Sequence, residues 1–275
     1  MSKSKVNLLG KGFVGSRYCE LTPDVIVNDR NDYEVKTDKV LYTISTIDNY
    51  NVYENPYLDI DTNLTTLIKT LESCKDKNVT FNFISSWFVY GNVPLPARED
   101  ADCDPKGFYS ITKRAAEQLL ISYCQTFGLK YRILRLSNIL GESDSKVSPK
   151  KNAVQYMINE LLNDRPVRLY DGGVAFRDYM YVDDAVRAIN LVMNNSKPNQ
   201  IYNIGNGVPV KLKDIIDYVV TKTGSKSQVT NVAPANFHNI VQTTNMVLDV
   251  EKLEMLGYKP KYQINDALDK LISAK

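Results

Sequence analysis

The sequence contains very little histidine, which excludes several classes of active site. Only one histidine, His238, occurs among 275 residues. A histidine-based metal site or a Ser-His-Asp hydrolase would therefore depend on that single side chain. We interpret His238 as a loop or surface residue and predict no metal site. The cysteines are also few and form no C-x-x-C pair, which is typical of reduced thiols in a cytoplasmic protein. They are Cys19, Cys74, Cys103 and Cys124.

Long apolar runs and a strong charge imbalance are also missing. No stretch of this sequence approaches the roughly 20 apolar residues that span a bilayer. The basic N-terminal segment lacks the uninterrupted apolar core of a signal peptide. The net charge is only +2, from 34 basic and 32 acidic residues, so nothing favours nucleic acid or an acidic membrane surface as a partner. We therefore expect a cytoplasmic protein without a membrane or nucleic-acid partner.

The first half of the chain alternates between apolar strand-like runs and helical patterns. This alternation predicts an α/β fold with a doubly wound parallel (Rossmann) sheet that is covered on both faces. The strand-like runs cover residues 6–10, 24–28, 39–45, 79–85 and 131–140. Apolar residues at helical spacing predict helices over residues 62–76 and 109–126.

The pattern changes after Gly141 and predicts a smaller mixed lobe for substrate binding. Helices are expected over residues 152–163, 184–193, 211–223 and 264–273. Asp183 is interpreted as the N-cap of the second of these helices. We predict two domains, a dinucleotide-binding domain at residues 1–140 and a substrate lobe at 141–275, with some later segments returning to the first domain.

A glycine-rich turn follows the first strand-like run. Glycines in a G-x-G-x-x-G pattern let the backbone turn tightly and approach a pyrophosphate, which then meets the free N–H groups of a helix N-terminus. The residues expected at the cofactor are Gly10, Gly12, Phe13, Val14 and Gly15. A second strand-like run ends at Asp29, nineteen residues after Gly10, which is about where an acid binds the adenosine ribose. Arg30 could instead accept the 2′-phosphate of NADP, so NAD is favoured and NADP stays possible.

Two further segments contain residues suited to proton transfer. Ser86 lies near the end of an apolar run, and Tyr109 precedes Lys113 by four residues at the start of a predicted helix. Side chains at i and i+4 share one helix face. A lysine ammonium beside a phenol favours the phenolate, so we expect Lys113 to lower the pKa of Tyr109 into a useful range. The Ser86 hydroxyl could hold a substrate oxygen against it.

In these segments the chain resembles the extended branch of the short-chain dehydrogenase/reductase family, and within it the nucleotide-sugar epimerases and dehydratases. The resemblance extends nearly from end to end. Its motifs are GKGFVGS, SSWFVYG, YSITK, LRLSNILG, RDYMYVDDA, YNIGNG and LGYKP. It implies that Ser86 and Tyr109 are catalytic and that Lys113 is catalytic and also holds the nicotinamide ribose.

The resemblance also implies that Asn138 and Arg177 contact the diphosphate of a nucleotide-diphosphate sugar. The alternatives are a capped strand end for Asn138 and a salt bridge between the lobes for Arg177. Arg135 is interpreted as a structural residue. The helices at 62–76 and 109–126 correspond to those that pair in dimers of the family, so we expect a homodimer. An intrachain core is the alternative for the apolar residues proposed for its seam, which are Leu67, Leu71, Leu119 and Tyr123.

The chain also departs from the family pattern. Leu9 stands where a first glycine is usual, and only nine residues separate Asp29 from Asp38, so the third strand is expected to be truncated. The late segment APANFHNIVQTT lacks the arginine that often binds the diphosphate, so either His238 or a lysine replaces it or the substrate differs. Trp87 and Phe88 occupy the positions where dehydratases have an acid/base pair, and neither side chain can transfer a proton.

These observations favour a nucleotide-sugar 4-epimerase that acts by transient hydride transfer to tightly bound NAD. Tyr109, as phenolate, would take the proton of the C4 hydroxyl. A 4-ketoreductase that consumes NADH or NADPH is the closest alternative, because it needs the same three side chains. A non-catalytic dinucleotide-sensing protein is a third possibility, and the presence of Ser86, Tyr109 and Lys113 argues against it.

Overall fold

The computed structural model describes residues 5–144 and 147–274 and has a six-stranded sheet at its centre. The strand order is β2-β1-β3-β4-β5-β9, and every neighbouring pair is parallel. The strands are β1 (Val6–Leu9), β2 (Val25–Val27), β3 (Lys39–Tyr42), β4 (Thr80–Ser86), β5 (Lys130–Leu136) and β9 (Gln200–Ile204). The doubly wound parallel fold expected from the sequence is thus confirmed.

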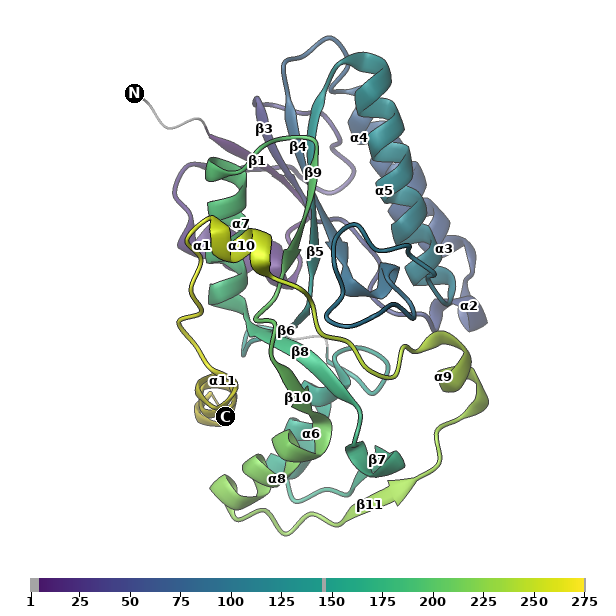
Figure 1. Cartoon of the computed structure of the whole chain (residues 1–275), viewed down its shortest axis with the longest axis vertical. Helices are drawn as coiled ribbons and strands as arrows, with labels where there is room; N and C mark the ends of the chain where they lie inside the picture. Colours follow the sequence, from purple (N-terminus) through teal and green to yellow (C-terminus); the bar gives the residue numbers. More distant parts are fainter. Residues whose placement is uncertain (1–4, 145–146, 275) are drawn as a thin grey trace.

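Helices cover both faces of this sheet (Figure 1). Helices α1 (Phe13–Leu21), α7 (Val182–Asn195) and α10 (Glu251–Met255) lie on one face, and α4 (Thr66–Glu72) and α5 (Phe108–Phe127) lie on the other. Each layer encloses its own apolar cluster. Because both faces are covered, the central strands are buried on both sides, and the polar side chains that they carry, such as Asn82 and Arg135, are buried as well.

Helix α5 places its first turn at the carboxyl-terminal edge of the sheet, next to the end of β4. It has no glycine or proline between Phe108 and Phe127, which favours an uninterrupted helix. It ends where Gly128 adopts a left-handed conformation with φ of 67°, a common helix stop. The motif residues near its N-terminus are therefore held on a rigid element.

The edge of the sheet next to β2 is shorter than the family pattern implies. No helix or strand occurs between β2 and β3, which agrees with the truncation predicted from the sequence. The Asn28 side chain donates to the carbonyls of Asp32 (3.0 Å) and Glu34 (2.8 Å), and the Lys36 N–H donates to Asn7 Oδ1 (2.7 Å). These bonds fold the short loop back against β1.

A smaller lobe lies at the carboxyl-terminal edge of the large sheet (Figure 1). It contains a three-stranded mixed sheet, β10-β8-β6, and a parallel pair, β11-β7, with three helices packed around one apolar cluster. The elements are β6 (Asn138–Leu140), β7 (Val167–Tyr170), β8 (Phe176–Tyr181), β10 (Pro209–Lys211), β11 (Val229–Val232), α6 (Ala153–Leu162), α8 (Leu212–Thr223) and α11 (Ile264–Ser273).

The second half of the chain contributes to both lobes. Strand β9 is the last strand of the large sheet, and α7 and α10 cover one face of it. The remaining elements are short. They are α2 (Asn51–Glu54), α3 (Tyr57–Ile60), a π-helical turn η1 (Asp61–Thr65), two 3-10 turns, η2 (Trp87–Val89) and η3 (Asp171–Gly173), and α9 (Asn236–Val241). A boundary at residue 140 remains a prediction.

Two local predictions are wrong. Helix α7 begins at Val182 with Tyr181 as its N-cap, so Asp183 is not the cap. Its carboxylate instead pairs with Arg17 of α1, with 2.6 Å between Oδ1 and Nε. His238 lies on the short helix α9, not in a loop, and its ring packs half-buried against Tyr170 at 4.6 Å between centroids.

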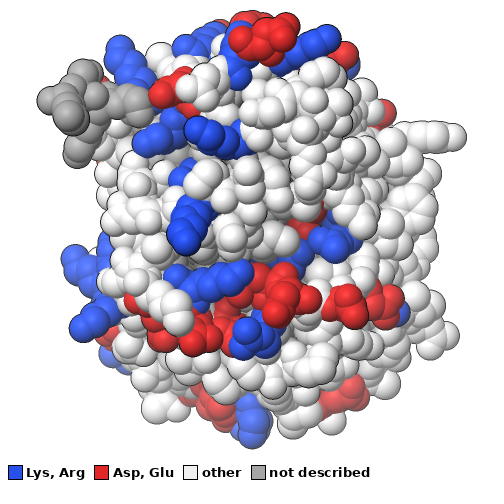
Figure 2. Space-filling view, turned by 45° about the horizontal axis from the view of Figure 1, so that its top comes forward, with Lys and Arg blue, Asp and Glu red and all other residues white. Residues whose placement is uncertain are grey.

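The proposed dimer seam is only partly available on the surface. Leu67 and Leu71 have no exposed area and pack in the core beneath α4, so their assignment to a seam is wrong. Leu119 and Phe108 are each 40% exposed on α5, and Ile111 of the same helix is 51% exposed. The right-hand flank in Figure 2, on the side of α4 and α5 in Figure 1, has few charged side chains.

Candidate active site

The glycine turn between β1 and α1 has the backbone geometry that its sequence predicts. Gly10 has φ of +102°, and a Cβ there would lie 2.6 Å from Thr43 Oγ1. A Cβ on Gly15 would lie 2.2 Å from the Gly10 carbonyl oxygen, so α1 packs directly on the turn. A Cβ on Gly12 would meet nothing within 4 Å. The turn thus leaves open space in front of the α1 N-terminus, where N–H groups are free to bind an anion.

The other residues expected at the cofactor occupy different surroundings. Asp29 and Arg30 lie just after β2, one residue beyond its end, and are exposed. Phe13 packs in a small cluster with residues of the second lobe, and Val14 packs against the core beneath α7. All four lie near the turn or the β2 edge. Their contacts with a dinucleotide stay a prediction.

Ser86 is the last residue of β4 and the N-cap of the turn η2. Its Oγ accepts a hydrogen bond from the Phe88 N–H at 3.3 Å. Because that bond uses a lone pair of the hydroxyl, the Ser86 proton can be donated to another oxygen. The side chain is half-buried, so part of its surface stays open to a ligand.

Tyr109 and Lys113 lie one turn apart on α5, and both are buried. Burial raises the pKa of Tyr109 to about 12, and the carboxylates of Asp59 and Asp48 act in the same direction, whereas a hydrogen bond with Ser86 opposes the shift. The expected lowering of the Tyr109 pKa by Lys113 is therefore wrong for this structure.

The environment of Lys113 explains this difference. Its Nζ donates to the Ile84 carbonyl at 2.7 Å and lies 4.2 Å from the centre of the Phe83 ring. Burial lowers the pKa of Lys113 to about 7, although Glu117 opposes the shift. Desolvation thus disfavours the charged forms of both side chains.

Trp87 and Phe88 build an aromatic surface next to Tyr109. Their rings stack with 3.9 Å between centroids, and the Phe88 ring meets the Tyr109 ring edge-on at 5.9 Å. Trp87 is buried and packs in a cluster with Met246. Phe88 is half-buried. The two positions provide no proton donor or acceptor for elimination of water.

Arg177 and Asn138 lie on neighbouring strands of the smaller lobe. Arg177 donates to the carbonyls of Thr243 and Phe176, and its guanidinium lies 5.1 Å from the centre of the Trp87 ring. No ion pair of Arg177 occurs within residues 5–144 and 147–274, so the alternative of a salt bridge finds no support there. Burial lowers the pKa of Arg177 to about 10.

Asn138 is the first residue of β6, and its Nδ2 donates to the Asp178 carbonyl at 3.0 Å. This bond ties the start of β6 to β8, beside Arg177. Contacts of Asn138 and Arg177 with a diphosphate stay a prediction.

Sequence reasoning did not assign roles to two buried polar groups that hold this region together. Asn63, on η1, accepts from the Thr46 N–H (3.0 Å) and donates to Thr112 Oγ1 on α5 (3.0 Å). Glu117 forms a bidentate pair with Arg135, at 2.8 and 3.0 Å, and the pair fixes α5 to β5. The structural interpretation of Arg135 is thus correct. The signal in the sequence for a role of Glu117 was its i, i+4 spacing from Lys113 on the same helix.

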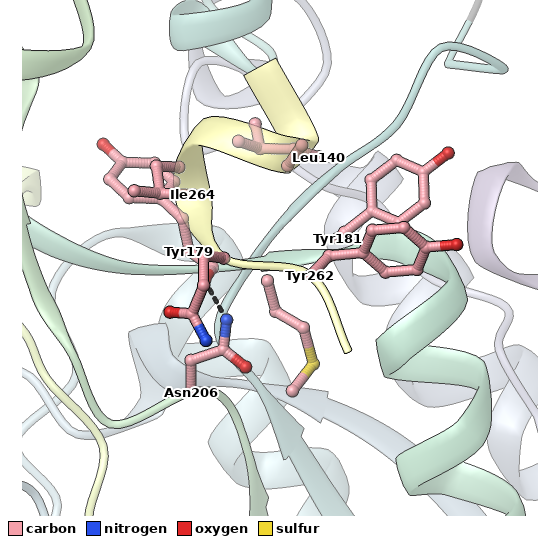
Figure 3. A pocket seen from close by; sticks show the side chains of 9 residues that line it. Leu140, Tyr179, Tyr181, Asn206, Tyr262 and Ile264 are labelled. Atoms are coloured by element: carbon pink, nitrogen blue, oxygen red, sulfur yellow. Dashed lines mark hydrogen bonds between the residues drawn. The ribbon is translucent and has the colours of Figure 1, made fainter. Parts of the chain in front are cut away.

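A narrow crevice lies between β8 and α11, away from Ser86 and Tyr109 (Figure 3). Its lining includes Tyr179, Asn206 and Tyr262, and the Asn206 amide donates to the Tyr179 carbonyl at 2.9 Å. There is no room for a water molecule inside it. None of the side chains proposed for catalysis lines it, so we do not assign the active site there.

A family model described as the NAD dependent epimerase/dehydratase family matches residues 32–205. The chain belongs to this family. The matched range begins after the glycine turn and includes Ser86, Tyr109, Lys113, Asn138 and Arg177. The resemblance inferred from the motifs is thereby confirmed.

Relatives within this epimerase/dehydratase family include different enzyme classes. The putative UDP-glucose 4-epimerase of Methanocaldococcus jannaschii is 28% identical over 239 residues, which cover 85% of this chain and 75% of the relative. The dTDP-4-dehydro-6-deoxyglucose reductase of Escherichia coli is 28% identical over 189 residues, which cover 68% of this chain and 58% of that protein. The UDP-glucose 4-epimerase of Thermus thermophilus, solved in complex with NAD, is 25% identical with a TM-score of 0.84, and 98% of each chain is covered.

Proposed function

We propose that this protein is an NAD-dependent nucleotide-sugar 4-epimerase. The observation that supports the proposal best is the convergence of Ser86, Tyr109 and the glycine turn at the carboxyl-terminal edge of one parallel sheet. Open α/β sheets bind ligands at this edge. Two of the relatives above have a 4-epimerase name, and the solved one contains NAD.

The residues at the first turn fit a dinucleotide. A side chain at Gly10 or Gly15 would collide with neighbouring atoms, whereas the space around Gly12 is open. The N-terminus of α1, at Phe13, faces that space with N–H groups that have no partner within the helix. We infer that Gly10, Gly12 and Gly15 hold the pyrophosphate and that Asp29 and Arg30 lie at the adenosine end.

The chemistry required of the chain is one reversible proton transfer. When bound, NAD supplies a hydride acceptor and a positively charged ring. Tyr109 takes the proton of the sugar C4 hydroxyl as hydride leaves C4, and returns it to the oxygen when hydride comes back to the other face. Ser86 holds that oxygen by donating its own proton. Lys113 supports the phenolate when it is protonated.

The substrate side of the proposal depends on Arg177 and Asn138. Within the described residues, the Arg177 guanidinium has no carboxylate partner and donates to backbone carbonyls. It can exchange those bonds for stronger ones with a diphosphate. We infer that Arg177 binds the diphosphate of the nucleotide sugar and that Asn138 contributes a hydrogen bond.

The experiment that tests this function has two parts. The purified protein is denatured, and the released dinucleotide is identified and quantified. The native protein is then incubated with UDP-glucose, and the products are separated. We expect stoichiometric NAD and a C4 epimer of unchanged mass. Loss of one water from the sugar would contradict the proposed chemistry, because Trp87 and Phe88 offer no acid or base.

A 4-ketoreductase is the second candidate. Arg30 is exposed beside Asp29, where it could bind a 2′-phosphate, and a relative named above is a reductase. An empty dinucleotide site in the purified protein, with turnover of a 4-keto sugar at the expense of NADPH, would favour this candidate over the epimerase.

We also propose that the protein is a cytoplasmic homodimer. Each subunit has two domains, residues 1–140 and 141–275, and some segments of the second range pack in the first domain. No helix in the described part of the chain is long and apolar enough to cross a bilayer. The exposed apolar residues Phe108, Ile111 and Leu119 on α5 are suited to pairing with a second copy. A monomer at micromolar concentration in light scattering would contradict the dimer.

A further inference from the structure

The aromatic surface formed by Trp87 and Phe88 is fixed in place from three sides. Trp87 is 3% exposed, packs in a buried cluster with Met246 and Leu248, and has the Arg177 guanidinium against its ring. Phe88 stacks on Trp87, and the two are successive residues of the turn η2. Because the supporting ring cannot move without opening the core, Phe88 cannot easily turn away from Tyr109.

Phe88 is also close to the place where the reacting sugar carbon must lie. Ser86 Oγ accepts from the Phe88 N–H, and the Phe88 ring meets the Tyr109 ring at 5.9 Å. A C4 hydroxyl held by Ser86 and Tyr109 therefore brings a neighbouring carbon against this ring. C3 has a hydroxyl, which would lose its hydrogen bonds there, so C5 and its substituent suit the apolar surface better.

The charges around this position disfavour a further negative charge. The carboxylates of Asp59 and Asp48 act on Tyr109, and Asp59 has no exposed area. Of the buried cations nearby, Lys113 donates to the Ile84 carbonyl, and Arg177 is assigned to the diphosphate under the proposed function. A carboxylate placed against Phe88 would lose its hydration without gaining a partner.

We propose that Phe88 determines the sugar specificity of this site, and that the substrate is a nucleotide sugar with an uncharged C5 substituent. Hydrogen, methyl or hydroxymethyl at C5 fits the aromatic surface, whereas the carboxylate of a hexuronate does not. This inference rests on the proposed function for the identity of the reacting hydroxyl. Phe88 acts here through contact with the substrate and takes no part in proton transfer.

The test compares the binding of UDP-glucose, UDP-xylose and UDP-glucuronate to the protein with its native dinucleotide content, by isothermal titration calorimetry. We expect the wild-type protein to bind UDP-glucuronate at least about 30-fold more weakly than UDP-glucose, or about 2 kcal/mol at 1.4 kcal/mol per factor of ten. UDP-xylose should bind more tightly than UDP-glucuronate, because it has no charged C5 substituent to desolvate.

Phe88→Ala removes the ring and lets water hydrate the carboxylate. The ratio of the two dissociation constants should fall at least about fivefold, as expected when a buried charge regains solvent. Phe127→Ala, the same substitution at an exposed position near the far end of α5, is the matched control and should keep the wild-type ratio. Each ratio compares two ligands on one variant, so a partly unfolded sample does not alter it.

The outcomes separate this inference from the proposed function. A wild-type protein that prefers UDP-glucuronate, or a ratio that Phe88→Ala leaves unchanged, would overturn the role of Phe88 while leaving a 4-epimerase possible. Selective binding of UDP-glucose without any turnover would contradict the epimerase and support the role of Phe88. A wild-type protein that binds none of the three ligands would contradict both.

Discussion

Replacement of Tyr109 by phenylalanine tests the proton transfer most directly. The substitution removes one oxygen and keeps the ring that packs edge-on against Phe88. If the phenol is the general base, turnover should fall by a factor of about 10² to 10⁴, the usual range for such a group. At 1.36 kcal/mol per factor of ten, this corresponds to about 3–5 kcal/mol of activation free energy.

The stability cost of this change should be much smaller. Tyr109 is 7% exposed, and burial already disfavours its ionised form. Loss of its hydroxyl should change the free energy of unfolding by about 1 kcal/mol or less, the net worth of a typical hydrogen bond. Equilibrium denaturation and the content of bound dinucleotide measure this part, and both should stay close to wild type.

Tyr42→Phe is the matched control for this experiment. Its hydroxyl is buried in the core beneath α4 without a hydrogen-bond partner in the described structure, and its ring stacks with Phe83. Removal of that oxygen should leave turnover unchanged and stability equal or slightly higher. The proton-transfer role of Tyr109 would be refuted if Tyr109→Phe retained turnover within about tenfold of wild type, a barrier change of about 1.4 kcal/mol.

Three further predictions concern stability. Arg135→Met removes the bidentate partner of the buried Glu117, which keeps its ion pair with Arg114 at 2.8 Å, and should cost about 1.5–3 kcal/mol of unfolding free energy in denaturant titration. A cost below about 1 kcal/mol would show that the bidentate pair is not needed. Leu71→Ala should cost about 2–5 kcal/mol of unfolding free energy. Leu119→Ala should cost little stability but weaken dimers in light scattering. If instead Leu71→Ala weakened the dimer and Leu119→Ala reduced stability, Leu71 would belong to the seam after all. Burial raises the pKa of Asp178 to about 6 from 3.8, so its contribution to stability is complete below pH ~3.8 and is lost as pH rises through about 6. Asp178→Asn should reduce the change of melting temperature with pH between these values. If that pH dependence stayed unchanged, Asp178 would be excluded as its source.

The parts of the site that depend on neighbours in sequence could be predicted from it. The glycine turn, the placement of Ser86 at a strand end and the Tyr109–Lys113 spacing each follow from a few adjacent residues. The truncated edge beyond β2 was also predictable, because the nine-residue separation of Asp29 and Asp38 is too short for a helix and a strand. Local spacing limits what the backbone can form.

Properties set by distant contacts could not be predicted in the same way. The pKa of Tyr109 is raised mainly by burial and also by the carboxylates of Asp59 and Asp48, which lie about 50 and 61 residues earlier in the sequence. Asp183 resembles a helix cap locally but pairs with Arg17, which is 166 residues away. Leu71 and Leu119 both occupy apolar helical positions, and only the tertiary packing shows that one is buried and the other exposed.

The segment that follows β11 shows how a departure from the family pattern can be accommodated. It lacks the arginine that the resemblance leads one to expect, and it passes from the smaller lobe to the first lobe. Phe237 packs edge-on against Tyr50 and Tyr53, with centroids 5.1 and 4.7 Å apart, and the Thr243 carbonyl accepts from Arg177. The backbone of this segment therefore holds the Arg177 side chain. Because APANFHNIVQTT supplies no guanidinium of its own, we propose that Arg177 gives the planar bidentate contact that a diphosphate favours.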